Sequence, residues 1–436
     1  MTIGIGLLGL GTVGAGVAEI LLTPHGRHPL VGDLALKRVA VRDLNRPRPV
    51  DLPSEIVCTD PEAVVNDPAV DIVVEVMGGL EPARSLILAA IAAGKPVVTA
   101  NKAVIARYGE EIAAAAAAKG VYVLIEAAVG GGIPIIEPLK QSLGGNRIQR
   151  VSGIINGTTN YILSRMADEG AAYEAVLADA QQLGYAEADP AADVEGGDAA
   201  DKIAILSGLA YGGSVQRPEI PTEGINRLDS RDVNYAAQLG YVVKLVASAQ
   251  FIDTDADDTV QLDVRVSPTL LPKDHPLAGV HGVNNAILVE GDPVGRVMFY
   301  GPGAGAGPTA SAVVADILNI AGIREATGQG GGLDPLLAAN RWRRCRLVDP
   351  GETLHRNYLR LQTGDQAGVI GRIGTCFGDQ GVSIRSIVQF ETSGSAADAE
   401  IVVITHEVQE ANFRRALAAI EALPDVKRVA ACLRTL

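Results

Sequence analysis

The chain has 436 residues, of which 47% are hydrophobic, and a formal net charge of −14 at pH 7. This length exceeds one ordinary hydrophobic core and predicts two or three domains. The negative charge argues against a nucleic-acid or anionic-membrane surface, since both need a basic footprint, and it favours small or zwitterionic partners.

Sequence signals for targeting, membrane insertion or cross-linking are not evident. The first residues, MTIGIGLLGLG, lack a cationic region and a cleavage site, and no apolar run approaches the roughly 18 residues of a membrane span. We therefore expect a cytoplasmic protein. The four cysteines have no C-x-x-C spacing, so neither a disulfide framework nor a zinc site is expected.

The chain begins with the pattern of a dinucleotide-binding fold. An apolar run at residues 3–8 leads into the motif GLGTVG and then into an apolar, helix-like stretch that ends at Leu22. In this context the glycines allow a tight turn and a close approach to a pyrophosphate, which the helix N-terminus receives. The motif predicts cofactor contacts at Gly9, Gly11, Thr12, Val13 and Gly14.

The end of the second predicted strand bears on the choice of cofactor. This strand, residues 36–41, is followed by Arg42 and Asp43, with Arg46 and Arg48 behind them. An acid here favours NAD, whereas arginines can hold the extra phosphate of NADP. Both cofactors stay open, and the two later arginines are equally compatible with a solvated charged turn.

Strands and helices then alternate as far as residue 125, which predicts a parallel sheet with helices on both faces. Ligands should collect at the carboxyl ends of its strands. Gly78 and Gly79 follow the third strand, where they would let a flat ring approach the backbone. Lys102 follows the fourth strand and would project a cation into the crevice.

A glycine-rich loop, residues 126–134, follows the last of these strands. Its carbonyl groups could turn inward and bind a hard cation, although a tight strand-to-helix turn without an ion fits the residues equally well. Next we expect a strand at 151–155, a turn at 156–160, a helix through Met166 and a strand-rich region at 242–300. The glycine-rich stretch 301–309 leads into a helix at 310–320 that is expected to return to the first domain.

One acidic helix organises the middle of the chain. If residues from Glu195 onward are helical, Asp198 and Lys202 lie one turn apart on the same face and Asp201 points elsewhere. An isolated pair of this kind is usually exposed and worth about 0.2–0.5 kcal/mol. Here apolar residues follow at once and the preceding loop is crowded with acids, which favours a cationic ligand group or a tuned lysine.

Together these motifs resemble the homoserine dehydrogenase family, from residue 3 to about residue 320. The match runs through GLGTVG, TANK, EAAVGGGIPII, INGTTNYIL, LGYAEADPAADVEGGDAADKIAIL and GPGAGAGPTASAVV. The resemblance implies reduction of L-aspartate 4-semialdehyde to L-homoserine with NADPH or NADH, a step in threonine, methionine and isoleucine biosynthesis.

The resemblance also implies roles for particular residues. Lys202 looks like the family's proton donor, Lys102 like its cofactor- and substrate-side lysine, and Glu187 like the carboxylate that holds the substrate amino group. The remaining matches are acids and turn residues of the substrate pocket, a glycine that touches the cofactor, and a sodium site: Asp193, Asp198, Gly157 and Thr158; Gly303; and Glu126, Val129, Gly131 and Ile133.

The expected fold class is α/β with three domains. Residues 1–128, completed by the helix at 305–320, form a Rossmann domain, and residues 129–304 form a mixed-sheet catalytic and dimerisation domain. After a linker at 321–350, residues 351–436 resemble an ACT domain with a ferredoxin-like fold. Such domains bind amino acids, so threonine is expected as effector, in a homodimer or homotetramer.

Two other functions are open to the same sequence. A phosphorylating aldehyde dehydrogenase also joins a Rossmann domain to a mixed sheet, but it needs a cysteine nucleophile in the crevice. Cys58 falls near the second-strand turn and the other cysteines lie late in the chain. A catalytically silent amino-acid sensor would need no proton donor, so the lysine and its acids argue against it.

Overall fold

The computed structural model describes residues 2–254, 259–327, 343–391 and 398–436. Contacts divide the chain into two compact units, each assembled from separate segments. Unit 1 contains residues 1–151, 201–219 and 285–345, and unit 2 contains residues 152–200, 220–284 and 346–436. The predicted glycine-rich linker at 328–332, with Arg341 and Trp342, lies outside the described residues.

Unit 1 contains a six-stranded parallel sheet in the order β3-β2-β1-β4-β5-β6, the order of a dinucleotide-binding Rossmann fold. The predicted alternation of strands and helices is confirmed. The elements are β1 (Ile3–Leu8), α1 (Thr12–Leu22), β2 (Leu34–Ala40), β3 (Val57–Cys58), α2 (Pro61–Asn66), β4 (Ile72–Glu75), α3 (Ala83–Ala92), β5 (Val97–Thr99), α4 (Lys102–Lys119) and β6 (Val123–Leu124).

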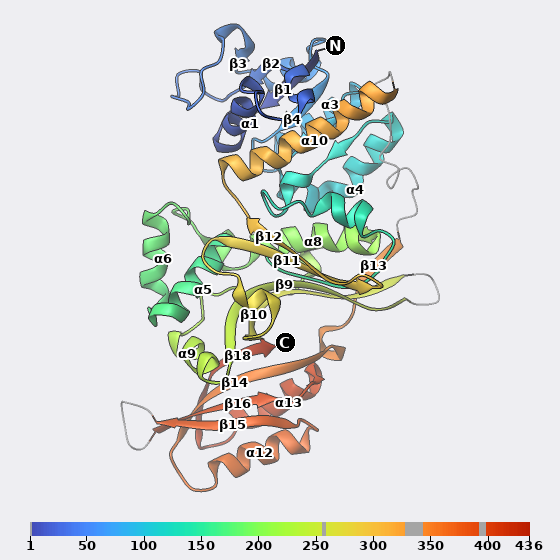
Figure 1. The fold of residues 1–436 in the computed structure, drawn as a ribbon. Coiled ribbons are helices and arrows are strands. Elements are labelled where there is room, and N and C mark those ends of the chain that lie inside the picture. Colours follow the sequence, from blue (N-terminus) through green and yellow to red (C-terminus); the bar gives the residue numbers. More distant parts are fainter. Residues whose placement is uncertain (1, 255–258, 328–342, 392–397) are drawn as a thin grey trace. The chain divides into compact units, whose positions relative to one another are not determined.

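Side-chain alternation along β1 places one hydrophobic core on each face of this sheet. Ile5 and Leu7 pack with α1 on one face, whereas Leu8 packs with α2, α3 and α4 on the other. Helix α10 (Ala306–Thr327) joins the first core, as the sequence predicted for its returning helix. In Figure 1 α10 (orange) runs across the blue nucleotide domain beside α1.

Helix α10 needs one correction to the sequence analysis. Among the described residues it is the one helix with the length and composition of a membrane span, over Ala306–Arg324, with a mean hydropathy of 1.3. Its Val313 and Ile317 are fully buried in the core that contains α1. Packing inside the nucleotide domain therefore explains an apolar stretch that the sequence analysis did not expect.

The remaining elements of unit 1 are a short sheet edge and one end of a long helix. Strands β12, β11 and β7 are neighbours in that order. The division between the units falls within both β7 and α8. Their bounds are β7 (Arg147–Ile154), α8 (Gly197–Tyr211), β8 (Gly213–Ser214), β11 (Asn284–Asp292), β12 (Gly295–Pro302) and β13 (Arg343–Leu347).

Unit 2 carries helices on one run of sheet, in the order β9-β10-β18-β14-β16-β15. Its first elements are α5 (Gly157–Glu169), α6 (Tyr173–Gln182), α7 (Ala191–Val194), α9 (Ser230–Gln238), β9 (Tyr241–Thr254) and β10 (Val260–Pro272). The predicted turn at 156–160 is wrong, because Asn156 caps α5 and the helix begins at Gly157. An asparagine followed by glycine reads as a turn, but here its side chain satisfies the first helical N–H groups.

The last part of unit 2 has the β-α-β-β-α-β order expected of an ACT domain. Its elements are β14 (Leu354–Gly364), α12 (Val369–Asp379), β15 (Ile384–Glu391), β16 (Asp398–Thr405), β17 (Val408–Gln409), α13 (Glu410–Glu421) and β18 (Val426–Thr435). Leu359, Phe377 and Phe413 belong to a separate core between the sheet and both helices. The predicted fold class, with a parallel sheet, a mixed sheet and this terminal domain, is confirmed.

Candidate active site

The glycine turn after β1 is shaped to receive a phosphate. Gly9 has φ +103°, and a Cβ on Gly14 would lie 2.1 Å from the Gly9 carbonyl oxygen, so both need glycine for the turn itself. Gly11 is different, because a Cβ there would meet no atom of the described residues within 4 Å. The N-terminus of α1, which starts at Thr12 and Val13, is therefore left open to an anion.

The charged residues beyond β2 are all solvent-exposed, and their contacts stay local. The Asp43 carboxylate accepts the Asn45 N–H at 2.8 Å, and the Arg48 guanidinium donates to the Arg46 carbonyl at 2.9 Å. Arg42 is exposed at the carboxyl end of the strand. The arrangement is compatible with a 2′-phosphate at Arg42 but does not select between NADP and NAD.

Two polar residues that the sequence analysis missed tie together the carboxyl ends of β4 and β5. Glu75 is fully buried and accepts the Thr99 hydroxyl at 2.7 Å. Asn101 donates from its amide to the Gly79 carbonyl at 2.8 Å and also caps α4, which begins at Lys102. A charged residue that ends an apolar strand was the available signal for Glu75.

These contacts hold the predicted cofactor residues in place. Gly78 and Gly79 have φ values of +76° and +78°, which only glycine adopts readily. Lys102 is half-buried in the first turn of α4, directly after the Asn101 cap. The glycine pair and the lysine are thus fixed to the same edge of the sheet.

Helix α8 carries the predicted aspartate and lysine pair, and both side chains are buried. Asp198 is 7% exposed and Lys202 is 8% exposed, so the reading as an ordinary exposed ion pair is wrong. The helix begins at Gly197, two residues later than expected. A buried carboxylate one turn from a buried amine is costly unless the charges meet or serve a ligand.

Asp201 on the same helix points elsewhere, as predicted, and joins α8 to the nucleotide domain. Its carboxylate accepts from Arg107 of α4 at 3.1 Å and from Arg217 at 2.8 Å. Lys102 and Lys202 therefore lie on two helices of unit 1 that this shared aspartate links. The sequence analysis had no means of identifying these partners, which lie 94 and 16 residues away from Asp201.

A second cluster gathers acids around the N-terminus of α5. The Asn156 amide donates to Asp193 at 2.7 Å and to Asp198 at 3.0 Å, so one neutral group bridges two carboxylates. The Thr158 hydroxyl lies 3.1 Å from Asp193 and donates to the Tyr185 carbonyl at 2.6 Å. Asp193, Asp198, Gly157 and Thr158 are thus brought together, and Asn156, which the sequence analysis passed over as part of a turn, holds them.

Glu187 lies apart from this cluster in its contacts. The residue is exposed, and its backbone carbonyl accepts the Gln181 amide at 3.1 Å. Its carboxylate is therefore available to solvent in the stretch before α7. The predicted contact with a substrate ammonium stays a prediction.

The loop predicted to bind a cation is closed by a buried glutamate. Glu126 is 5% exposed, and its Oε1 accepts the N–H groups of Ile135 at 2.6 Å and Ile136 at 2.9 Å. Its Oε2 accepts the Glu137 N–H at 2.9 Å. A carboxylate oxygen has two lone pairs, so Oε2 keeps one for a cation beside the loop carbonyls. Val129, Gly131 and Ile133 are buried around it.

A second buried acid lies next to Glu126. Asp316 of α10 is 1% exposed, accepts the Glu126 N–H at 2.8 Å, and has no partner for its Oδ1 within the described part of the chain. Burial raises the pKa of Asp316 well above its usual range and also raises that of Glu126. Two neighbouring buried acids favour a proton or a cation between them.

Gly303 is required by packing. A Cβ at this position would lie 1.9 Å from the side-chain nitrogen of buried Asn285. Its predicted contact with the cofactor stays a prediction. Within the described ranges, no group of three or more His, Cys, Asp or Glu side chains could hold a metal ion.

Comparison with known proteins places this geometry among the dehydrogenases. The family model for the homoserine dehydrogenase NAD-binding domain matches residues 9–126, that for homoserine dehydrogenase matches residues 134–318, and that for the ACT domain matches residues 357–425. A homoserine dehydrogenase from Synechocystis sp. is 57% identical over the full length of both chains.

Solved structures agree with the sequence match. A homoserine dehydrogenase from Thiobacillus denitrificans has a TM-score of 0.89 and 42% identity, covering 100% of this chain and 98% of that one. A hyperthermophilic archaeal homoserine dehydrogenase in complex with NADPH has a TM-score of 0.61 and 29% identity. It covers 73% of this chain and 97% of its own.

Proposed function

Because the chain belongs to the homoserine dehydrogenase family, we propose that it reduces L-aspartate 4-semialdehyde to L-homoserine with NADPH or NADH. The observation that carries the proposal is the pair of buried residues Asp198 and Lys202, with Asp198 bridged to Asp193 by Asn156. A sensor without catalysis has no use for a buried amine beside acids. The four cysteines are outside this cluster, which disfavours the phosphorylating aldehyde dehydrogenase.

The nicotinamide cofactor supplies the hydride when it is bound. The open turn at Gly11, with Gly9, Thr12, Val13 and Gly14, fits its pyrophosphate. Contacts from the glycine pair, the α4 lysine, the strand-end arginine and the late glycine complete the proposed set: Gly78, Gly79, Lys102, Arg42 and Gly303.

Lys202 gives its proton to the alkoxide that develops on the aldehyde oxygen. Asp198, one helical turn before it, orients the amine, and Lys102 adds positive potential near the forming oxyanion. Glu187 and Asp193 hold the substrate ammonium, with Gly157 and Thr158 at the same helix N-terminus. Each of these roles is a proposal that the burial of Lys202 and the contacts of Asn156 support.

Replacement of the proton donor tests the assignment. We expect Lys202→Met to bind NADPH normally, by fluorescence titration, while kcat falls by about 10²–10⁴-fold, the usual contribution of general acid catalysis. Lys119→Met, on the exposed end of α4, is the matched control and should keep full activity. Normal turnover by Lys202→Met would exclude the mechanism.

We also propose a sodium ion at Glu126, Val129, Gly131 and Ile133. The free lone pair of Glu126 Oε2 and the neighbouring buried acid Asp316 support a monovalent cation at this loop. Replacing sodium chloride with choline chloride at equal ionic strength should lower the melting temperature. Glu126→Gln should melt at the same temperature in both salts, and a sodium effect that persists in this variant would place the ion elsewhere.

Regulation and assembly are the broadest part of the proposal. An ACT domain supports an amino-acid effector, and we propose threonine, acting on a cytoplasmic homodimer or homotetramer. The proposed domains are those expected from the sequence, with boundaries at 128, 304 and 350. A steady-state assay with NADPH and NADH, with and without threonine, tests the cofactor preference and the effector together, and sedimentation measures the assembly.

A further inference from the structure

A crevice within unit 2 lies between the ACT domain and the segment that precedes α9. It encloses about 240 Å³, less than the roughly 300 Å³ at which pockets for drug-sized ligands begin, so it suits a molecule of amino-acid size. Residues 429–433 of β18 form one wall, and residues 223–232 form the other. Pro268 of β10 closes one side.

The rim of this crevice carries one charge of each sign. Glu223 and Arg227 are both exposed, and neither side chain forms an ion pair within the described residues. Arg227 is nevertheless close enough to lower the pKa of Glu223, against the stronger effect of partial burial, which raises it. A carboxylate and a guanidinium that are near each other but unpaired leave a gap for a ligand with both charges.

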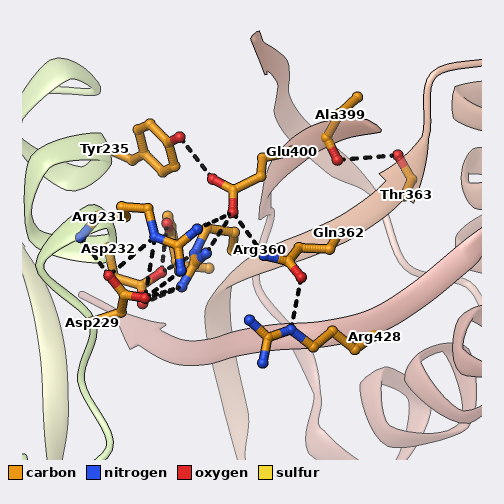
Figure 2. A network of polar contacts seen from close by, with 11 residues as sticks. Asp229, Arg231, Asp232, Tyr235, Arg360, Gln362, Thr363, Ala399, Glu400 and Arg428 are labelled. Atoms are coloured by element: carbon orange, nitrogen blue, oxygen red, sulfur yellow. Dashed lines mark hydrogen bonds and ion pairs between the residues drawn. The ribbon is translucent and has the colours of Figure 1, made fainter. Parts of the chain in front are cut away.

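The floor of the crevice is already neutralised. Asp232 is 1% exposed and accepts from Arg360 Nε at 2.7 Å, from Arg360 Nη2 at 3.0 Å and from the Tyr358 hydroxyl at 3.1 Å. Figure 2 shows Asp232 and Arg360 within a wider network that includes Glu400. Because Asp232 is engaged by these groups, Glu223 is the acid left to receive an ammonium group.

The wall around this floor is largely apolar. Leu228 and Leu433 are buried there, and Val429 lies beside them on β18. Cys432 adds a thiol whose pKa burial raises to about 12, so it stays neutral at physiological pH. A small aliphatic or hydroxylated side chain would be accommodated, whereas a charged side chain would lose its hydration without compensation.

We propose that this crevice is a binding site for a small zwitterionic α-amino acid, with its carboxylate on Arg227 and its ammonium on Glu223. The proposal rests on the amino-acid regulation proposed above and assigns it a location. The crevice belongs to both β18 and the segment leading into α9, and α9 in turn contacts α5. The first residues of α5 hold Asp193 and Asp198, so the site has a short physical route to the catalytic acids.

Calorimetric titration of the full chain with L-threonine tests this location. Glu223→Gln and Arg227→Gln should each weaken binding by at least about tenfold, the cost of one charge-assisted hydrogen bond. Glu62→Gln and Arg27→Gln are matched controls, because both residues are exposed on the nucleotide domain. Acetate and ethylamine, each carrying one of the two charges, should bind far more weakly than threonine.

Several results would overturn the proposal. They are no threonine binding to the wild-type chain, equal binding by both crevice variants, and binding of acetate as tight as that of threonine. A change of oligomeric state in the crevice variants, without a change in threonine affinity, would assign the crevice to an interface between copies. Reductase activity is assayed separately, so a chain that binds threonine here but reduces no aspartate semialdehyde defeats the proposed function alone.

Discussion

The side chain of Asn156 does two jobs that can be separated by one substitution. Its carbonyl oxygen accepts the Thr159 N–H at 2.9 Å and caps α5, while its amide donates to Asp193 and Asp198. Asn156→Asp keeps an acceptor at the helix cap, where aspartate is equally favourable. It removes the shared donor and adds a third carboxylate between the first two.

We expect Asn156→Asp to lower kcat/KM by at least about tenfold, because the loss of one charge-assisted hydrogen bond is worth about 1.5–3 kcal/mol. The added negative charge should raise the pKa values of the acids, and the rising limb of the pH–rate profile should move to higher pH. Asn66→Asp, exposed on α2, is the control and should change neither quantity. An unchanged pH profile would mean that the acids play no part in the reaction.

Lys244 is a buried amine outside the proposed mechanism, and it predicts a pH dependence of stability. It is 1% exposed and donates to Asn160 Oδ1 at 3.0 Å and to the Val280 carbonyl at 2.5 Å. Burial lowers its pKa from 10.5 to about 8, with Asp168 opposing the shift. Between these values the unfolded chain binds the proton and the folded chain does not, so stability should rise with pH.

This rise amounts to about 3 kcal/mol at most, since one unit of pKa is about 1.4 kcal/mol. Urea unfolding of the wild-type chain at pH 8.0 and pH 10.5 should show a smaller loss of stability at the higher pH than Lys244→Met shows. The two proteins differ in this one titrating group, so their difference isolates it. Parallel pH curves for both proteins would contradict a depressed pKa.

At the scale of elements, the packing of α1 against α10 links a stretch at the start of the chain to one three hundred residues later. A Cβ on Gly16 would lie 2.8 Å from the Ala306 carbonyl oxygen and 2.9 Å from the Ala310 Cβ. Gly16→Ala should therefore push the two helices apart, lower the melting temperature and weaken NADPH binding at the N-terminus of α1. Differential scanning fluorimetry and cofactor titration measure both effects.

Gly109→Ala provides the comparison within the same domain. A Cβ there would meet Ile105 at an ordinary 3.8 Å, and alanine in a helix interior is favoured over glycine by about 0.5–1 kcal/mol. This variant should be as stable as the wild type or more so. If Gly16→Ala behaves in the same way, the close packing of α1 on α10 is not what positions the cofactor turn.

Elements with a strong local pattern were predictable, whereas contacts between distant residues were not. The glycine motif placed β1 and the start of α1 within one residue, and helical spacing paired Asp198 with Lys202. The bridge from Asn156 to both acids spans 37 and 42 residues, and no periodicity encodes it. Asn156 was misread because one residue type serves both turns and helix caps.

At the scale of the whole molecule, a buried ion network joins the ACT domain to the segment around α9. Arg360 of β14 is 1% exposed and pairs with Asp232 of α9 at 2.7 Å and with Glu400 of β16 at 2.8 Å (Figure 2). Glu400 also accepts from Tyr235 and Arg231 of α9. Removing the ACT domain would leave Asp232 buried without its cation, so regulation is better tested in the full chain.

The network predicts that loss of one partner costs more than loss of all three charges. Arg360→Met strands two buried carboxylates and should lower the urea midpoint by an amount equivalent to about 3–5 kcal/mol. The triple variant Arg360→Met, Asp232→Asn, Glu400→Gln removes the uncompensated charge and should recover most of that loss. Arg372→Met, which breaks a pair whose arginine side chain is 43% exposed, should cost less than about 1 kcal/mol. If Arg360→Met and Arg372→Met shift the midpoint equally, the buried network does not hold the ACT domain to α9.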